Sequence, residues 1–151
     1  MNYKDRLQEL REYYNFSQRE IAEKIQLTKS AYNQYEQQYR IIPVLKLNDI
    51  ANVFNVSINY LLNISNDKTH EKSYKNLDII KSGIRLKEFR KSINYTQKKL
   101  SDKLNIATSL ISDYEKGTRF ISTHALYTIC KKHNISADYL LGKTDSPKYL
   151  K

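Results

Sequence analysis

Residues 17–36 are SQREIAEKIQLTKSAYNQYE, and residues 96–115 are TQKKLSDKLNIATSLISDYE. In each stretch, two short segments with apolar residues at helical spacing are joined by about three residues. Ser17 and Glu20 form a capping box, which marks the start of a helix. Thr28 is a good N-cap for the helix that follows. Each stretch therefore predicts two short helices joined by a tight turn.

The two stretches belong to a longer internal repeat. A shift of 79 positions aligns residues 6–62 with residues 85–141 without a gap, and gives 19 identities in 57 positions. Two copies of this size can each bury a small core, so the repeat predicts two small domains and not a solenoid.

Five short helices are expected in each copy. In the first copy, the first helix is residues 4–14, where Leu7, Leu10 and Tyr14 recur at helical spacing. The second follows Ser17 and the third is residues 29–37. The fourth starts at Pro43, and the short fifth is capped by Ser57. In the second copy, Gly117 is expected to end the third helix, and Ser122 or Thr123 to cap the fourth. The prediction is an all-α chain with domains at 1–66 and 84–147, a linker at 67–83 and a tail at 148–151. Within the linker, the apolar residues Leu77, Ile79 and Ile80 before Gly83 are either isolated anchors or a helical or extended spacer that docks on one domain.

Composition narrows the function classes. Three glycines and two prolines in 151 residues argue against an all-β fold, and one cysteine excludes an internal disulfide and cysteine zinc clusters. There is no run of 18 apolar residues and no signal-peptide pattern at the N-terminus, so we expect a cytoplasmic protein without membrane contact. The net charge of +10 favours a polyanionic partner, and residues 85–151 carry +8 of it.

The second helix of each pair carries polar residues near its N-terminus. They are Thr28, Lys29, Ser30, Asn33 and Gln34 in the first copy and Ala107, Thr108, Ser109, Ser112 and Asp113 in the second. Such a helix fits the major groove of double-stranded DNA, where lysine can donate to guanine and an amide side chain can pair with adenine. An aspartate could accept from cytosine but is a poor neighbour for phosphate. The pattern predicts helix-turn-helix motifs, with the first copy as the better base reader.

Both copies resemble the Cro/cI-like (XRE) helix-turn-helix family of repressors, over about four-fifths of the chain. In the first copy the resemblance rests on Ser17-Gln18-x3-Ala22, Tyr35-Glu36-x3-Arg40 and Ala51-x4-Val56-Ser57-x2-Tyr60-Leu61-Leu62. In the second it rests on Thr96-Gln97-x3-Ser101, Tyr114-Glu115-x-Gly117-x-Arg119 and Ile135-Ser136-x2-Tyr139-Leu140-Leu141. The chain departs from the family at Gln38, where glycine is usual, and at Ser101, where Ala22 is the first copy's counterpart.

The resemblance implies two tandem, lambda-repressor-like five-helix domains, sequence-specific operator binding and dimeric recognition. It implies that Gln18 and Gln97 lie near a DNA phosphate or flanking base, and that Arg40 and Arg119 lie near the backbone. The implied groove residues are Lys29, Ser30, Asn33, Gln34, Thr108, Ser109, Ser112 and Asp113. Lys98 and Lys99 begin the second helix of the second copy, where we expect phosphate contacts.

Other residues are better explained by structure. Glu36 with Arg11, and Glu115 with Arg90, are expected to form internal ion pairs. The paired tyrosines Tyr35/Tyr114 and Tyr60/Tyr139 are expected in the core and not as stacking platforms for single strands. Cys130 and His133 also fall on core positions, and with His124 they lack a fourth ligand for zinc. No catalytic pattern stands out, so we expect no enzyme, cofactor or metal.

Three hypotheses follow. The first is a sequence-specific regulator, a repressor whose two heads bind adjacent half-sites. The 20 residues from 65 to 84 that lie between the copies would span about 25 Å as a flexible linker. Homodimerisation through a fifth helix is a variant of this hypothesis. The second is a protein-interaction module, such as an antitoxin or an inhibitor of a bacterial defence nuclease. The third is a nonspecific DNA coater driven by the basic half. The richness in Lys, Asn, Ile and Tyr hints at an AT-rich genome and a mobile element.

Overall fold

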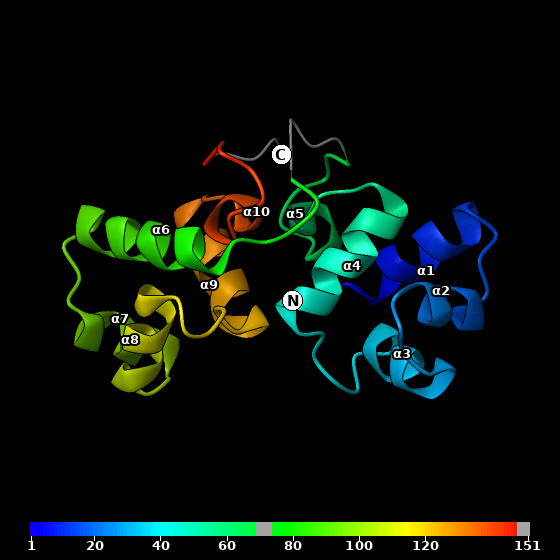
Figure 1. The fold of residues 1–151 in the computed structure, drawn as a ribbon, viewed down its shortest axis with the longest axis horizontal. Helices are drawn as coiled ribbons and strands as arrows, with labels where there is room; N and C mark the ends of the chain where they lie inside the picture. The colour runs from blue at the N-terminus through cyan, green and yellow to red at the C-terminus, as the bar shows by residue number, and fades with distance from the viewer. Residues whose placement is uncertain (69–73, 148–151) are drawn as a thin grey trace. The chain divides into compact units, whose positions relative to one another are not determined.

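The two halves of the chain fold as separate helical units. The computed structural model describes residues 1–68 and 74–147, and contacts between residues divide them into one unit up to residue 68 and another from residue 74. The described residues form ten helices and no β-strand (Figure 1). The prediction of an all-α chain with two five-helix domains is confirmed. The predicted tail at 148–151 lies outside the described residues.

The first unit has the predicted helices and caps. Its helices are α1 (Lys4–Tyr13), α2 (Gln18–Lys24), α3 (Lys29–Glu36), α4 (Val44–Phe54) and α5 (Ile58–Leu61). Ser17 and Glu20 make both hydrogen bonds of the capping box, and the Thr28 and Ser57 side chains each accept a backbone N–H of the next turn. Pro43 is the N-cap of α4, one position before its first residue.

The core of the first unit lies between these helices. The side chains with at most 1% exposure include Leu7, Ile21, Tyr32, Leu47, Ile50, Phe54 and Leu61. Tyr14, expected on the inner face of the first helix, is instead 43% exposed. The reason is that α1 ends at Tyr13, and the Tyr14 ring then stacks at the edge of the core, with its centroid 5.7 Å from that of Phe54.

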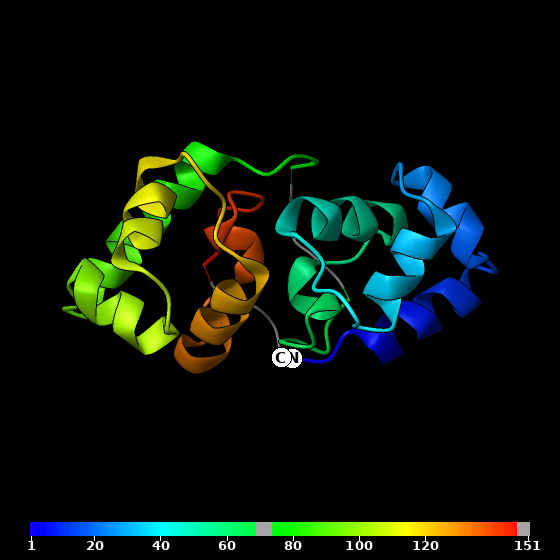
Figure 2. The ribbon, with the colours of Figure 1, turned by 90° about the horizontal axis from the view of Figure 1, so that it is seen from below.

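The second unit repeats this plan. Its helices are α6 (Ile79–Ser92), α7 (Gln97–Leu104), α8 (Thr108–Lys116), α9 (Thr123–His133) and α10 (Ala137–Leu140). Gly117 ends α8 in the left-handed conformation, and Ser122 is the residue that caps α9. In both views of the ribbon, α7 lies against α8 as α2 lies against α3 (Figures 1 and 2).

The second unit begins earlier in the sequence than the repeat predicts. Residues 79–83 were expected to be linker, but they form the first turn of α6, and Asp78 caps that turn by accepting from the Lys81 N–H at 3.0 Å. Gly83 then allows α6 to pack on the end of α8, because a Cβ there would lie 2.6 Å from the carbonyl oxygens of Tyr114 and Glu115. This tertiary contact has no signature in the local sequence.

Residues before α6 are also attached to the second unit. The backbone N–H of Tyr74 donates to the Lys143 carbonyl at 2.7 Å, and that of Asp78 donates to the Leu141 carbonyl at 3.0 Å. The predicted linker at 67–83 therefore differs from the structure over its last ten residues, which pack with the second unit.

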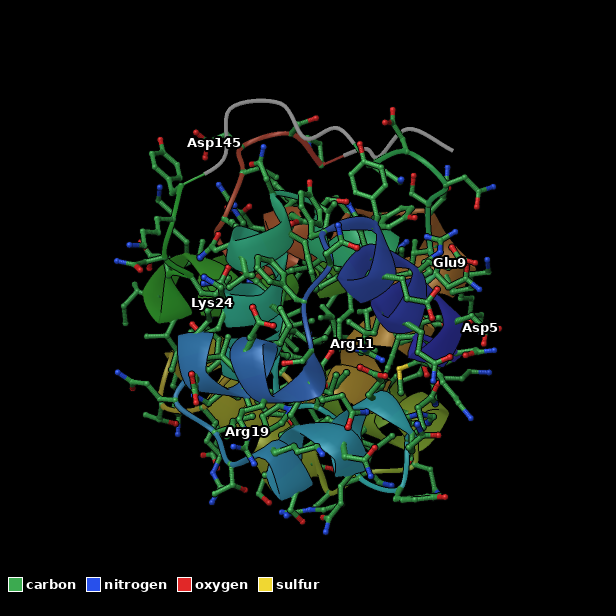
Figure 3. All side chains as sticks on the ribbon, turned by 90° about the vertical axis from the view of Figure 1, so that its right-hand side faces the viewer. Asp5, Glu9, Arg11, Arg19, Lys24 and Asp145 are labelled. Carbon is green, nitrogen blue, oxygen red and sulfur yellow. The ribbon has the colours of Figure 1, made fainter. Side chains whose placement is uncertain are left out.

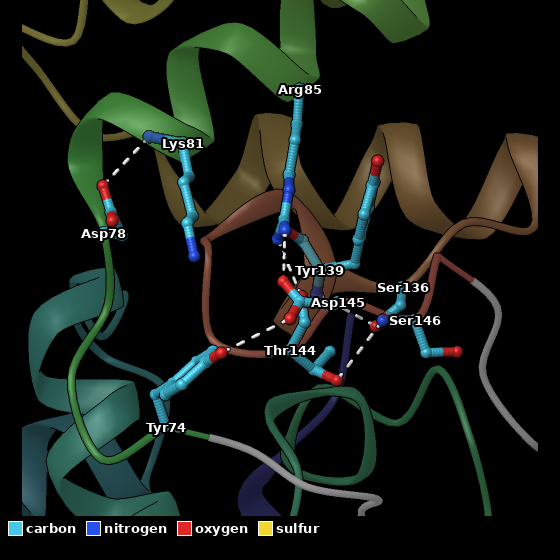
Figure 4. Close-up of polar contacts among 9 residues, drawn as sticks. All are labelled: Tyr74, Asp78, Lys81, Arg85, Ser136, Tyr139, Thr144, Asp145 and Ser146. Atoms are coloured by element: carbon cyan, nitrogen blue, oxygen red, sulfur yellow. Dashed lines mark hydrogen bonds and ion pairs between the residues drawn. The ribbon is translucent and has the colours of Figure 1, made fainter.

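In each unit an arginine of the first helix holds the segment that follows the fifth helix. In the second unit, Arg85 donates to the carbonyls of Tyr139 and Thr144 and to Asp145 Oδ1, each at 2.7 Å (Figure 4). Its guanidinium carbon lies 4.2 Å from the centre of the Tyr139 ring. We call this arrangement the arginine strap.

The first unit has the same strap on Arg6. Its guanidinium donates to the carbonyls of Tyr60 and Ser65 and, at 2.6 Å, to Asn66 Oδ1. It also lies 4.2 Å from the centre of the Tyr60 ring. The end of each unit is thus fixed to its first helix. The two straps differ in the residue that supplies the second carbonyl, Ser65 or Thr144, and in the side-chain acceptor, Asn66 or Asp145.

Candidate nucleic-acid interface

The two helix pairs share one turn geometry. Gln26 and Asn105 both adopt the left-handed conformation, with φ of 59° and 54°. The turn is closed by the N–H of the next residue, which donates to the carbonyl of Ala22 at 2.8 Å in the first unit and of Ser101 at 3.0 Å in the second. Asparagine tolerates this conformation well, and the first unit adopts it with glutamine. Both units therefore present a helix-turn-helix.

A buried ion pair fixes the third helix of each unit to its first. Arg11 Nε and Nη2 donate to the two carboxylate oxygens of Glu36 at 3.1 and 3.0 Å, and Glu36 is fully buried. Arg90 donates to Glu115 in the same way at 2.7 and 2.9 Å. The hydrogen bond to the carboxylate raises the pKa of each arginine. The predicted pairing is confirmed in both units.

The glutamine that begins the second helix joins this network. The amides of Gln18 and Gln97 each donate to the paired carboxylate, Glu36 or Glu115, at 3.3 Å. Gln18 also donates to Asn33 Oδ1 at 2.9 Å. The side-chain amide oxygen of Asn33 is therefore bonded within the protein, and its side-chain NH2 group remains available to donate to a base. The sequence suggests that Asn33 pairs with adenine through two hydrogen bonds. That pairing would require the hydrogen bond from Gln18 to Asn33 to break.

The rest of α3 presents polar groups to solvent. Thr28 Oγ1 accepts the Ala31 N–H at 3.1 Å, so its oxygen serves the helix cap. Lys29 and Ser30 are exposed and Gln34 is half-buried. Within the described part of the chain these three side chains make no hydrogen bond or ion pair. They are the residues of the first motif with their polar groups available.

In the corresponding helix of the second unit, α8, two of the candidate side chains also have partners. Its N-cap residue is Ala107, which has no side chain to cap the helix. The Thr108 hydroxyl contacts Ser101 Oγ at 2.9 Å, and Asp113 lies 3.8 Å from Arg119. Ser109 is exposed and Ser112 half-buried. Arg119 lies beside the Asp113 carboxylate, a poor neighbour for phosphate, in an exposed and therefore weak ion pair.

The predicted phosphate-binding cations are exposed, with loose partners. Lys98 pairs with Asp102 at 2.6 Å, one helical turn further on. Lys99 Nζ lies 4.5 Å from the centre of the Tyr95 ring, and Arg40 lies 5.8 Å from that of Tyr35. Exposed pairs of this kind contribute little to stability, so these cations can exchange their partners for phosphate.

The charge of the two units is distributed differently. On the first unit, acidic residues such as Asp5 and Glu9 of α1 accompany Arg19 and Lys24 of α2 on the surface (Figure 3). On the second unit, four exposed lysines lie outside α7 and α8 and have no ion pair among the described residues: Lys87, Lys91, Lys131 and Lys132. Much of the basic surplus is therefore on α6 and α9 and not on the helix-turn-helix.

The remaining candidates fall into structural roles. Cys130 is buried, which raises the pKa of its thiol. His133, expected in the core, is half-buried with its ring 5.0 Å from that of Phe89, and burial and Lys132 lower its pKa. No cluster of metal-ligating side chains occurs among the residues that the structure describes. None of the described helices has the length and hydropathy needed to cross a membrane.

Two structural roles were missed at the sequence level. The Gln38 side chain binds the start of α1, and the Ser101 hydroxyl joins α7 to α8. Both positions stand out in the sequence as departures from the family pattern. That signal marks the positions but does not give the contacts.

Comparisons with known proteins agree with this geometry. A family model described as "Helix-turn-helix" matches residues 7–61, and one described as "Helix-turn-helix domain" matches residues 83–146. The chain is 44% identical over 66 residues to the HTH-type transcriptional regulator ImmR of Bacillus subtilis (strain 168), a match that covers 44% of this chain and 52% of that protein. No solved structure matches significantly.

A second relative comes from the same strain. It is named "Uncharacterized HTH-type transcriptional regulator YobD", and it is 35% identical over 75 residues, which are 50% of this chain and 67% of that protein. The chain thus spans about half of the first relative's length and two thirds of the second's.

Proposed function

This chain belongs to the helix-turn-helix (XRE-type) family of DNA-binding transcriptional regulators, and we propose that it is a repressor whose two motifs bind adjacent, unlike half-sites of one operator. The observation that carries the proposal is that α3 and α8 sit on the same frame with different outward side chains. The frame is the Arg–Glu–Gln network, and it occurs in both units.

The first motif reads bases through donors and amides. Lys29 at the start of α3 can donate to guanine O6 or N7, and Gln34 can pair with adenine through both ends of its amide. Both side chains are without partners in the described residues. Ser30 and the NH2 group of Asn33 add weaker contacts on the same helix.

The second motif relies more on hydroxyls and on phosphate contacts. Thr108, Ser109 and Ser112 supply short polar groups along α8, and Asp113 is held beside Arg119. Lys98 and Lys99 at the start of α7, together with Gln97, contact phosphate. Arg40 and Arg119 contact the backbone beyond each recognition helix. Phosphate contacts set the position of each head, and the two different helices make the operator asymmetric.

The first experiment is selection of bound duplexes from a random pool by the full chain at about 0.15 M salt, where weak nonspecific contacts are screened. We expect an enriched motif with two unlike half-sites. The double variant Lys29→Ala with Gln34→Ala should lose one half-site and keep the other. Lys131→Ala, which removes one charge from α9 outside the motifs, is the control and should leave the motif unchanged. Absence of enrichment would contradict sequence-specific binding.

Stoichiometry and expression test the finer points. Two heads on one chain require one chain per operator, measured by light scattering of the complex. Two chains on a strictly symmetric operator would instead indicate homodimerisation through a fifth helix. A reporter gene with the selected site over its promoter should be expressed less in the cytoplasm of cells that make the chain. An increase would identify an activator.

A further inference from the structure

A hydroxyl pair joins the two helices of the second motif and has no counterpart in the first. Ser101 lies on α7 with 1% exposure, and its Oγ is 2.9 Å from Oγ1 of Thr108, the first residue of α8. The aligned residues in the first unit are Ala22 and Lys29. An alanine has no group that could hold the side chain at the start of the recognition helix.

The direction of this hydrogen bond follows from the third group present. Ser101 Oγ also lies 2.8 Å from the Lys98 carbonyl oxygen. A carbonyl oxygen only accepts, and a hydroxyl has a single proton to donate. Ser101 therefore donates to Lys98, and the proton between Ser101 and Thr108 belongs to Thr108.

The hydroxyl proton of Thr108 therefore points toward Ser101 Oγ, inside the protein. What remains on the outer side of Thr108 is its lone pairs and its methyl group. In the major groove, adenine and cytosine present an amino donor, whereas guanine and thymine present a keto acceptor. An oxygen that can only accept pairs with the first class and opposes the second.

We propose that Ser101 is a positioning residue that fixes the Thr108 hydroxyl as an acceptor, so that the second motif selects an amino base, A or C, over a keto base, G or T, on the strand that Thr108 faces. This inference rests on the proposed function, since it concerns how α8 reads DNA. The first motif has the opposite character at the same place, because a lysine ammonium only donates. The first residues of α3 and α8 therefore favour complementary classes of base.

The test repeats the selection with the full chain and three variants: Ser101→Ala, Thr108→Val and the double variant. Ser101→Ala gives α7 the residue that α2 has at the aligned position, and circular dichroism checks that the helices are retained. For the wild type we expect one column of the second half-site to favour A or C about fivefold or more over G or T. Ser101→Ala frees the hydroxyl to donate or accept, so this preference should fall to near equality.

The double variant separates positioning from packing. Thr108→Val removes the hydroxyl and should abolish the preference, and adding Ser101→Ala in that background should change nothing more in that column. If the wild-type motif is clear and Ser101→Ala leaves every column unchanged, the inference is overturned. It is also overturned if Ser101→Ala weakens binding equally on all sequences, since that is a packing effect. If the wild type enriches no motif at all, the proposed function itself fails.

Discussion

The two units end their third helices in the same backbone conformation with different residues. Gln38 has φ of 60° and Gly117 has φ of 73°. In the second unit a Cβ at Gly117 would lie 2.8 Å from Ile80 Cδ1, so glycine leaves room for the start of α6. In the first unit α1 begins at Lys4, and the Gln38 side chain binds there: its Oε1 accepts the N–H of Tyr3 at 2.9 Å and of Lys4 at 3.3 Å.

The difference between Gln38 and Gly117 is related to how the first helix of each unit, α1 or α6, is capped. The N-cap of α1 is Tyr3, which provides no capping side chain, and the free N–H groups of that turn need acceptors. Gln38 supplies one from the end of α3. In the second unit α6 is longer at its N-terminus, and Asp78 caps it locally. The departure from the family's glycine is thus a change of capping residue, and the helix-turn-helix beside it is intact.

The largest effect is expected from Gly83→Ala. The added Cβ would meet two backbone carbonyl oxygens at 2.6 Å, and backbone cannot move aside as a side chain can. We expect the free energy of unfolding of the second unit to fall by about 3 kcal/mol. This free energy is measured by a urea titration in which hydrogen exchange of peptides from each unit reports the unfolding of that unit. Lys4→Ala, the aligned change in the first unit, is the control and should cost under about 0.5 kcal/mol; equal losses would contradict the comparison.

A smaller effect is expected from Gly117→Gln, which copies the first unit's residue into the second. The left-handed conformation costs a non-glycine residue about 1 kcal/mol, and the flexible end of Ile80 must also shift. We expect a loss of about 2 kcal/mol, seen as faster exchange in α6 and α8. Unchanged exchange would mean that α6 does not need glycine there.

The reverse change, Gln38→Gly, should cost about 1 kcal/mol. It removes the acceptor of the Tyr3 N–H, one of the two acceptors of the Lys4 N–H, and the bond to the Met1 carbonyl; Asn2 Oδ1 still accepts the Lys4 N–H at 3.2 Å. The change also relieves the left-handed strain, so the two effects partly offset each other. Faster amide exchange at Tyr3 is the readout. Gln38→Asn suits the left-handed backbone but is one methylene too short, so it should resemble the glycine variant; full protection there would show that reach is unimportant.

The smallest effect concerns pH and the two arginine straps. The hydrogen bond from Arg85 lowers the pKa of Asp145, so the carboxylate contributes to the strap above its ordinary pKa of 3.8, and this contribution is lost as pH falls through the lowered value. Asn66 in the first strap does not titrate. We expect acid to shift the NMR signals of the Arg85 Nε–H and not those of Arg6. A transition that survives Asp145→Asn would have another source.

The sequence predicts those features that depend on contacts within one helical turn. The caps at Ser17, Thr28 and Ser57 were predicted because each side chain bonds an N–H three residues away. The buried pair of Arg11 and Glu36 was found because the repeat shows both residues twice. The helix-turn-helix itself follows from these elements.

The sequence did not predict contacts between distant segments. Gln38 and Tyr3 are 35 positions apart, and Gly83 matters only because α8 approaches it. The bond between Gln18 and Asn33 changes which base-reading groups are available, yet either residue alone looks free. The roles of individual candidate DNA contacts stay predictions until the selection is done.

The anchoring of both ends of the connecting segment limits the distance between the two heads. Asn66 is held by Arg6 and Tyr74 by the Lys143 carbonyl, so only eight peptide steps separate the anchors, at most about 29 Å when fully extended. On B-DNA, two helical turns inserted between half-sites add about 68 Å, more than twice that length. With two heads bound, no path of the segment bridges such a gap while both anchors hold. The hydrogen bonds that hold Asn66 and Tyr74 then limit the number of base pairs that can separate the two half-sites.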